Sequence, residues 1–413
     1  MHLPKSWNFF ILCFLATVLS AVAKNPLENM QLGGFRVPEY NTEGEMVSQF
    51  FGESASMHSS GDVKIDMVRV EYYSEGEVAL TVKTPYCFYN QKTRDARSDA
   101  PITANMKGVS VSGTGFKLGV ESRTVELLNE SKVVLEGMIQ VAESSDEDEP
   151  SEGSDVTTIT SKKLFLNYHD RTARFVETVG VDNPELNLTC EELDMRFSEE
   201  NKMEQIDALN GCHVKIFDRA TVKTVTEPQL ELLCETLQLR FNESNKVDQI
   251  DALGGIRLEV FDVMTQTDDP FMAQGDRGTN DTTVITSEKL FLNQTDRAAK
   301  FVNTVHVKDA ELVMDSDTLE LRYNESNEIN WIEAVGSVRL LTEGREAIAG
   351  RASYDAKSNE FLLQEEPRII EGRNMLFGDR IRFWRSEKRM VCEPSARLVV
   401  IPDDKVKTDI FEY

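Results

Sequence analysis

Carboxylates are the commonest groups in this chain that could do chemistry, and three of them recur at one position of a repeated segment. Asp207, Asp251 and Glu333 each stand opposite the apolar side of an alternating stretch. A glycosidase needs only two carboxylates placed across a sugar bond. A carboxylate that recurs on the polar side of a strand is, however, typical of a solvated sheet face. The recurrence therefore favours a structural role over a catalytic pair.

Other residue types that catalyse reactions or bind metals are few. His58, His169, His213 and His306 are the histidines beyond the first 23 residues, and none stands near a serine or cysteine in a nucleophilic motif. The sequence lacks the nucleophile elbow, the zinc-protease motif, the phosphate loop, the dinucleotide fingerprint and any C-x-x-C pair. We therefore expect no enzyme activity, no metal site and no cofactor.

Two cysteines occupy equivalent positions in successive repeats. Cys190 and Cys234 each precede a strand leucine by three residues. They could form a disulfide between strands in an oxidising compartment, or they could be two small buried thiols. The buried-thiol interpretation is preferred, and the alternative stays open at this point.

The charge of the chain excludes some classes of partner. The chain has 413 residues, 40% of them apolar, and a formal net charge of −26. Binding to nucleic acid or to an anionic membrane surface needs clustered lysine and arginine. We therefore expect no nucleic-acid partner, and a chain long enough for two or three folded domains.

The first 23 residues have the pattern of an export segment. Lys5 precedes an apolar stretch, and Ala21-Val22-Ala23 resembles a cleavage site. The apolar stretch from Trp7 to Ala23 is shorter than the ~20 residues that span a bilayer comfortably. Cleavage as a signal peptide is the preferred interpretation, with retention as an inner-membrane anchor as the alternative.

The chain contains an internal repeat. Residues 157–197 align without a gap on residues 283–323, with 21 of 41 positions identical, so the two segments must adopt one fold. A second, shorter repeat is also visible: residues 201–209 recur at 245–253 and more loosely at 327–335.

Each copy has the pattern of a hairpin of two half-buried strands. Leu237, Leu239 and Phe241 alternate with polar residues, as strands do when one face is buried. An Asn/Ser turn follows, and the returning strand contains Gly254-Gly255, where a bend or bulge is expected. A strand that bends while one side stays apolar lets a sheet curl around a core or a ligand.

Composition divides the chain into segments. Residues 31–140 are β-rich without a close repeat, and residues 157–401 carry the repeats. Residues 141–156 are almost wholly acidic and small, which predicts a solvated linker; a calcium site is disfavoured because the EF-hand spacing is absent. Residues 263–282 are polar and predict a long loop.

The repeat resembles the OstA-like β-jellyroll repeats of lipopolysaccharide-transport proteins. The resemblance is carried by residues 237–260, 193–216 and 319–340, with Gly378-Asp379-Arg380-Ile381 as a further family-like turn into a strand. Residues 157–401 look like the LptA type, and the amino-terminal part with Gly34-Phe35-Arg36-Val37-Pro38-Glu39-Tyr40 is similar to the LptC type. The resemblance implies an all-β fold, a curled antiparallel β-jellyroll with two modules in series.

The resemblance also implies a function in the periplasm. Such proteins carry lipopolysaccharide toward the outer membrane with its acyl chains in an apolar trough, and they assemble with other transport-bridge proteins through open sheet edges. Arg240 and Arg322 would then offset the acidity near the lipid phosphates. The candidate trough walls are Ile206, Ala208, Val214, Ile216, Leu237, Leu239, Phe241, Ile250, Ile256, Leu258, Leu319, Leu321, Ile332 and Val338.

Two other functions remain in competition with transport. A structural or interaction protein of the cell envelope would have tightly closed sheets without a trough. A glycan-active enzyme on a parallel β-helix would also have short stacked strands, although the Asn/Ser turns favour antiparallel hairpins.

Overall fold

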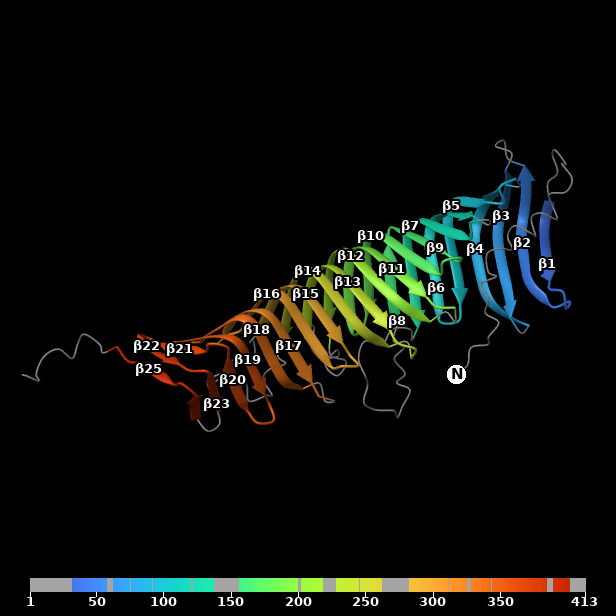
Figure 1. The fold of residues 1–413 in the computed structure, drawn as a ribbon. Coiled ribbons are helices and arrows are strands. Elements are labelled where there is room, and N and C mark those ends of the chain that lie inside the picture. The colour runs from blue at the N-terminus through green and yellow to red at the C-terminus, as the bar shows by residue number, and fades with distance from the viewer. Residues whose placement is uncertain are drawn as a thin grey trace, which may run out of the picture. The chain divides into compact units, whose positions relative to one another are not determined.

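The computed structural model describes residues 32–401 apart from 58–61, 75, 91, 120–121, 137–155, 200–201, 218–227, 245, 262–281, 311, 325–327, 343 and 385–388. The regular elements in this described part are all strands (Figure 1). No helix there is long and apolar enough to cross a membrane. The expected all-β class is confirmed. The export segment at 1–23, the acidic run and the polar loop fall outside the described residues, except for Val156 and Thr282, which begin strands.

The chain divides into two compact units. Unit 1 comprises the described residues up to Val214 together with Gln238–Val247, and unit 2 comprises most of the rest. The strands that lie wholly or largely in unit 1 are β1 (Leu32–Tyr40), β2 (Met46–Met57), β3 (Val63–Ser74), β4 (Glu77–Tyr89), β5 (Ala96–Met106), β6 (Val109–Gly119), β7 (Thr124–Glu136), β8 (Val156–Ser161), β9 (Lys163–Asn167), β10 (Thr172–Asn183), β11 (Leu186–Phe197) and β12 (Met203–Ile216).

Unit 2 contains the remaining strands, although the ends of two of them count with unit 1. They are β13 (Leu230–Phe241), β14 (Val247–Phe261), β15 (Thr282–Asn293), β16 (Ala298–Lys308), β17 (Val313–Tyr323), β18 (Ile329–Thr342), β19 (Arg345–Asp355), β20 (Glu360–Gln364), β21 (Arg368–Glu371), β22 (Asn374–Phe377), β23 (Arg380–Trp384), β24 (Arg389–Glu393) and β25 (Arg397–Val399).

Most strands pair with the next strand along the chain. In unit 1 the strands from β1 to β7 pair in order, and in unit 2 those from β14 to β20 do so. Towards the end of the chain β19 also pairs with β21, β20 with β23, and β22 with β25, and all these pairings are antiparallel. The predicted hairpin turns are present: Asn242 Oδ1 accepts hydrogen bonds from the backbone of Ser244 and Lys246, and Asn324 Oδ1 accepts one from Glu328. An antiparallel meander is not a parallel β-helix, so the architecture proposed for a glycan-active enzyme is wrong.

Every second strand of the repeat region bends sharply at two residues with positive φ. Gly254 and Gly255 form this corner in β14, with φ of +82° and +64°, and the register with β15 shifts there. Asn210-Gly211 and Gly336-Ser337 form it in β12 and β18, as the repeat predicts. Glu177-Thr178 and Asn303-Thr304 form the same corner in β10 and β16 without glycine. At each corner the strand changes direction, so its two parts lie at an angle to each other.

The core lies on the concave side of these bends. The largest fully buried side chains include Tyr89, Phe50 and Phe175 in unit 1 and Phe301 and Ile256 in unit 2. No helix covers either face in the described part of the chain, so only the folded-over half of the same sheet can bury these side chains. The curled antiparallel jellyroll is thereby confirmed.

No disulfide joins the five described cysteines beyond the export segment, and four of the five are buried. Cys190 and Cys234 therefore follow the buried-thiol interpretation. The proposed boundary between a domain at 31–140 and one at 157–401 stays a prediction. In the structure β7 pairs with both β8 and β9 within unit 1.

Candidate functional site

All fourteen predicted wall residues lie on strands, at two different depths. Eight are buried: Ile206, Ala208, Val214, Leu237, Ile256, Leu258, Leu319 and Val338. Six are partly exposed: Ile216, Leu239, Phe241, Ile250, Leu321 and Ile332. The alternating pattern identified the inward face, but it did not separate these depths.

An unbroken row of buried apolar residues crosses unit 2 beside the corners. We call it the inner row. Leu319 is the predicted residue in it, and its register partner on β18 is Ala334. The inner row consists of Ala252, Leu290, Phe301, Leu319, Ala334, Ala352, Leu363 and Ile381, each no more than 7% exposed and each the register partner of the next.

A second row runs parallel to the first, two residues closer to the hairpin turns. This outer row contains the predicted Ile250, Leu321 and Ile332, and Leu321 pairs directly with Ile332. In full it consists of Ile250, Leu292, Ala299, Leu321, Ile332, Tyr354, Phe361 and Phe383, again each the register partner of the next. Six of the eight are partly exposed, while Tyr354 and Phe361 are 9% and 5% exposed.

The outer row is the part of the inward face that is partly exposed to solvent at six of its eight positions. Neighbouring strands lie about 4.8 Å apart, so eight strands carry the row over roughly 34 Å. Tyr323 extends the same face of β17 beyond Leu321, and its hydroxyl is buried without a hydrogen-bond partner. Burial raises the pKa of this phenol. The hydroxyl oxygen at this end of β17 therefore lies out of contact with solvent.

The sequence reasoning missed several members of both rows. Leu292, Tyr354, Phe361 and Phe383 were not among the predicted wall residues. Leu290 and Leu292 stand in the segment that repeats Leu164 to Leu166, so marking every inward position of the aligned copies would have found them. Residues 354–383 follow the clear repeats, and only the pairing of β19, β20 and β23 places them in the row.

The recurring carboxylates lie on the polar face of the sheet, and two of them form hydrogen bonds with a neighbouring strand. Asp207 Oδ1 accepts a hydrogen bond from Gln238 Nε2 at 2.7 Å, and Glu333 Oε1 accepts one from Arg351 at 2.7 Å. Arg322, expected to face lipid phosphate, pairs with Glu320 at 2.8 Å. No group of acidic, histidine and cysteine side chains in the described part of the chain could hold a metal ion. These contacts are structural.

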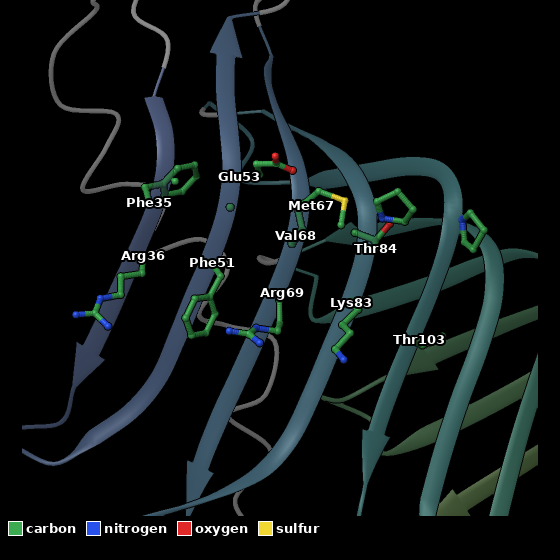
Figure 2. Close-up of a pocket in the computed structure, with 14 residues that line it drawn as sticks. Phe35, Arg36, Phe51, Glu53, Met67, Val68, Arg69, Lys83, Thr84 and Thr103 are labelled. Carbon is green, nitrogen blue, oxygen red and sulfur yellow. The ribbon is translucent and has the colours of Figure 1, made fainter.

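Unit 1 contains a pocket of about 750 Å³ at the bends of its first strands (Figure 2). Phe35, Met67, Pro85 and Pro101 contribute apolar walls. A Cβ on Gly52 would lie 2.5 Å from the Phe35 ring, so glycine at this position lets the ring lie across β2. Ligand pockets of proteins typically have volumes of 300–1,000 Å³.

A row of cations crosses the same pocket. Arg36 is the register partner of Phe51, Phe51 of Arg69, and Arg69 of Lys83, so four neighbouring strands place these side chains on one face (Figure 2). That face points away from the core, because the alternating neighbours Phe50 and Val68 are buried. The pocket and its cations were not predicted, since a register between distant strands cannot be read from alternation alone.

Two family models match the chain. Residues 52–136 match "Lipopolysaccharide-assembly, LptC-related", and residues 284–389 match "LptA/(LptD N-terminal domain) LPS transport protein". The first matched region lies in unit 1 and the second in unit 2. No curated protein matches the chain significantly.

LptH and TcdB2-TccC3 are two solved structures with weak overall similarity to this chain. LptH of Pseudomonas aeruginosa, described as the LptA homologous periplasmic component of the lipopolysaccharide transport device, is 14% identical; the match covers 29% of this chain and 95% of LptH, with a TM-score of 0.27. TcdB2-TccC3 is 6% identical over 86% of this chain and 29% of that one, with a TM-score of 0.08. Scores this low have no bearing on function. The two family matches confirm the resemblance seen in the sequence: this chain carries an LptC-related region followed by a region of the LptA/LptD amino-terminal type.

Proposed function

We propose that this protein is a periplasmic component that carries lipopolysaccharide toward the outer membrane, with the acyl chains held along the outer row of unit 2. The two family models describe lipopolysaccharide assembly and transport, and they match regions in series on one chain. The observation that carries the proposal is the outer row itself, an apolar line across eight paired strands that is partly exposed on six of them.

The physical requirement for such a carrier is a continuous apolar surface. Each CH₂ group moved from water into an apolar site gains about 0.8 kcal/mol, so an acyl chain of a dozen carbons would cost roughly 10 kcal/mol to expose. A gap of one polar residue would interrupt that gain. No polar residue interrupts the row from Ile250 to Phe383.

The alternative is a structural protein of the cell envelope with a closed core. The inner row fits both functions, because its members are buried in either case. The outer row distinguishes them, since a purely structural core gains nothing from leaving Ile250, Leu321 and Ile332 partly open to solvent. We therefore favour the carrier.

Site-specific photo-crosslinking tests the proposal. A benzophenone amino acid at Leu321 or Ile332 is expected to capture lipopolysaccharide in cells, detected as an antibody-reactive shift of the protein band. Leu253 and Leu341 are matched controls in unit 2, because they are apolar and 39% and 40% exposed but lie outside both rows. Capture at the controls alone, or at none of the four, would refute the carrier and leave the structural alternative.

Assembly with other transport-bridge proteins belongs to the same proposal. Among the described strands, β1 pairs only with β2, so its second edge is open to a further strand. Cysteines placed singly along β1 are expected to form disulfides with cysteines on the edge strand of a bridge partner. Crosslinks at every second position would support strand addition, whereas crosslinks without this alternation would count against it.

A further inference from the structure

We propose that the pocket between β1 and β5 is a second site, which binds an anionic amphiphile with its phosphate on the row Arg36, Arg69 and Lys83 and its hydrocarbon against Met67, Pro85 and Pro101. The site lies wholly in unit 1, whereas the outer row belongs to unit 2. This inference rests on the proposed function in one respect only, the source of the amphiphile. The chemistry that the pocket would recognise is a phosphate attached to an apolar chain, whatever molecule carries it.

The cations in this pocket are unusual for so acidic a chain. The whole sequence has 71 acidic and 45 basic residues, yet the pocket lining contains Arg36, Arg69 and Lys83 against one carboxylate, Glu53. Arg69 Nε lies 3.4 Å from Glu71. Neither Arg36 nor Lys83 has an ion-pair partner among the described residues. Arg36 and Lys83 thus face solvent at the two ends of the row, and Lys83 lies directly beside Arg69.

The geometry of the row suits a phosphate group. Register partners on neighbouring strands lie about 5 Å apart, so Arg69 and Lys83 can contact one phosphate together. The guanidinium of Arg69 lies 4.0 Å from the centre of the Phe51 ring, which holds its planar donor group in place. Guanidinium groups form paired hydrogen bonds with phosphate, and an oriented one loses less entropy on binding.

The remaining walls suit hydrocarbon. Met67 is 59% exposed on the face of the cations, in a backbone conformation with φ of +50°, and it lies two residues before Arg69. Pro85 and Pro101 have no amide hydrogen to offer a polar ligand, and they line the same pocket as Met67. An inorganic anion would leave these apolar walls uncovered. The combination therefore favours an amphiphile over a free ion.

Calorimetric titration of the full chain tests the site, with dodecyl phosphate below its micellar concentration as the probe. We expect binding that weakens about tenfold in the double variant Arg36→Gln/Lys83→Gln, as loss of two exposed charge contacts implies. Decyl phosphate should bind roughly tenfold more weakly than dodecyl phosphate, because it buries two fewer CH₂ groups. Lys132→Gln is the matched control, since Lys132 is an exposed cation of unit 1 outside the pocket.

Inorganic phosphate and dodecyl maltoside separate the two halves of the ligand. Neither compound is expected to displace dodecyl phosphate from the pocket at concentrations that saturate the site with dodecyl phosphate. Equal affinity for inorganic phosphate would overturn the amphiphile in favour of a simple anion site. Equal binding of dodecyl phosphate to the double variant and the wild type would also overturn the proposal.

A benzophenone amino acid at Met67 then locates the bound probe. Capture of dodecyl phosphate at Met67, absent at the exposed Val78 of the same unit and reduced by the double variant, would support the pocket. Capture of lipopolysaccharide at Leu321 is measured in parallel, and the double variant should leave it unchanged. In the wild type, absence of lipopolysaccharide capture at Leu321 would refute the proposed function, while absence of dodecyl phosphate capture at Met67 would refute this inference.

Discussion

A Cβ atom on Gly254 would lie 2.6 Å from the Cβ of Glu235, closer than real Cβ contacts allow. Gly254 and Glu235 thus fix how tightly β14 bends at its corner. Gly255, the other half of this corner, has nothing within 4 Å of its own Cβ position. The two adjacent glycines therefore separate the effect of backbone conformation from that of steric contact.

Alanine at these two glycines is expected to destabilise unit 2 to different degrees. Both residues have positive φ, so Gly255→Ala should cost about 1 kcal/mol from the backbone alone. Gly254→Ala should cost about 1–3 kcal/mol more, because the contact with Glu235 forces the chain apart. Denaturant unfolding of the two variants measures this difference. Equal free energies of unfolding would show that the corner relaxes without cost.

The carboxylate of Glu177 should make stability depend on pH. It accepts hydrogen bonds from Lys162 Nζ at 2.6 Å and Lys163 Nζ at 2.5 Å, and these lower its pKa to about 2 from an ordinary value of 4.5. A lowered folded-state pKa contributes stability that is present above pH 4.5 and is lost as the pH falls toward 2. Glu177→Gln should therefore be less stable than the wild type at pH 6, with the difference shrinking between pH 4.5 and pH 2.

Unfolding midpoints of wild type and Glu177→Gln at several pH values test this expectation. Glu136→Gln is the control, because no ion pair in the described part of the chain involves Glu136. In the second copy of the repeat Asn303 stands at the position equivalent to Glu177, and its side-chain amide donates a hydrogen bond to Glu288 at 2.8 Å. A difference between wild type and Glu177→Gln that stays constant from pH 6 to pH 2 would contradict the ion pair.

Thiol reactivity should separate the buried cysteines from Cys392. Burial raises the pKa of Cys87 to about 12, so almost no thiolate forms at pH 8 and the side chain is shielded from reagents. Cys392 is only partly buried, although burial also raises its pKa. Iodoacetamide at pH 8 is expected to label Cys392 first and Cys87 only in denaturant. Mass spectrometry of the peptides measures both rates, and equal labelling of the native protein would contradict the described core.

Asp62 joins three strands of unit 1 and should be costly to remove. It is 3% exposed, and it accepts hydrogen bonds from Arg97 at 2.6 Å and from Asn90 Nδ2 at 2.9 Å. Asp62→Ala should destabilise the protein by about 2–3 kcal/mol, because it removes two hydrogen bonds to a buried charged group. Lys117→Ala removes the exposed pair with Glu126 and should cost less than about 1 kcal/mol. Denaturant unfolding that gives similar losses for both variants would show that burial adds nothing at Asp62.

Alternation along single strands was readable from the sequence and proved accurate. Leu237 to Phe241 and Leu319 to Tyr323 lie in strands, each followed by the expected Asn/Ser turn. The glycine corner at Gly254 was also readable, because few other residues tolerate positive φ. The corners at Glu177-Thr178 and Asn303-Thr304 were not, since no propensity marks a glutamate or a threonine for that conformation.

Depth within the interior was decided by the tertiary structure. Ala252 and Ile250 share one face of β14 and look equivalent in the sequence, yet Ala252 is fully buried and Ile250 partly exposed. The difference arises from distance to the corner, where the two halves of the sheet meet.

The sequence by itself determined that this chain forms antiparallel hairpins with one apolar face, because a period of two leaves few alternatives for residues that must be half buried. Only the tertiary structure brought Arg36, Arg69 and Lys83 into one row and aligned Ile250 with residues as distant as Phe383. The physical reason is register: alternation fixes which side of a strand a residue faces, whereas packing and turns fix which residue of the next strand it meets.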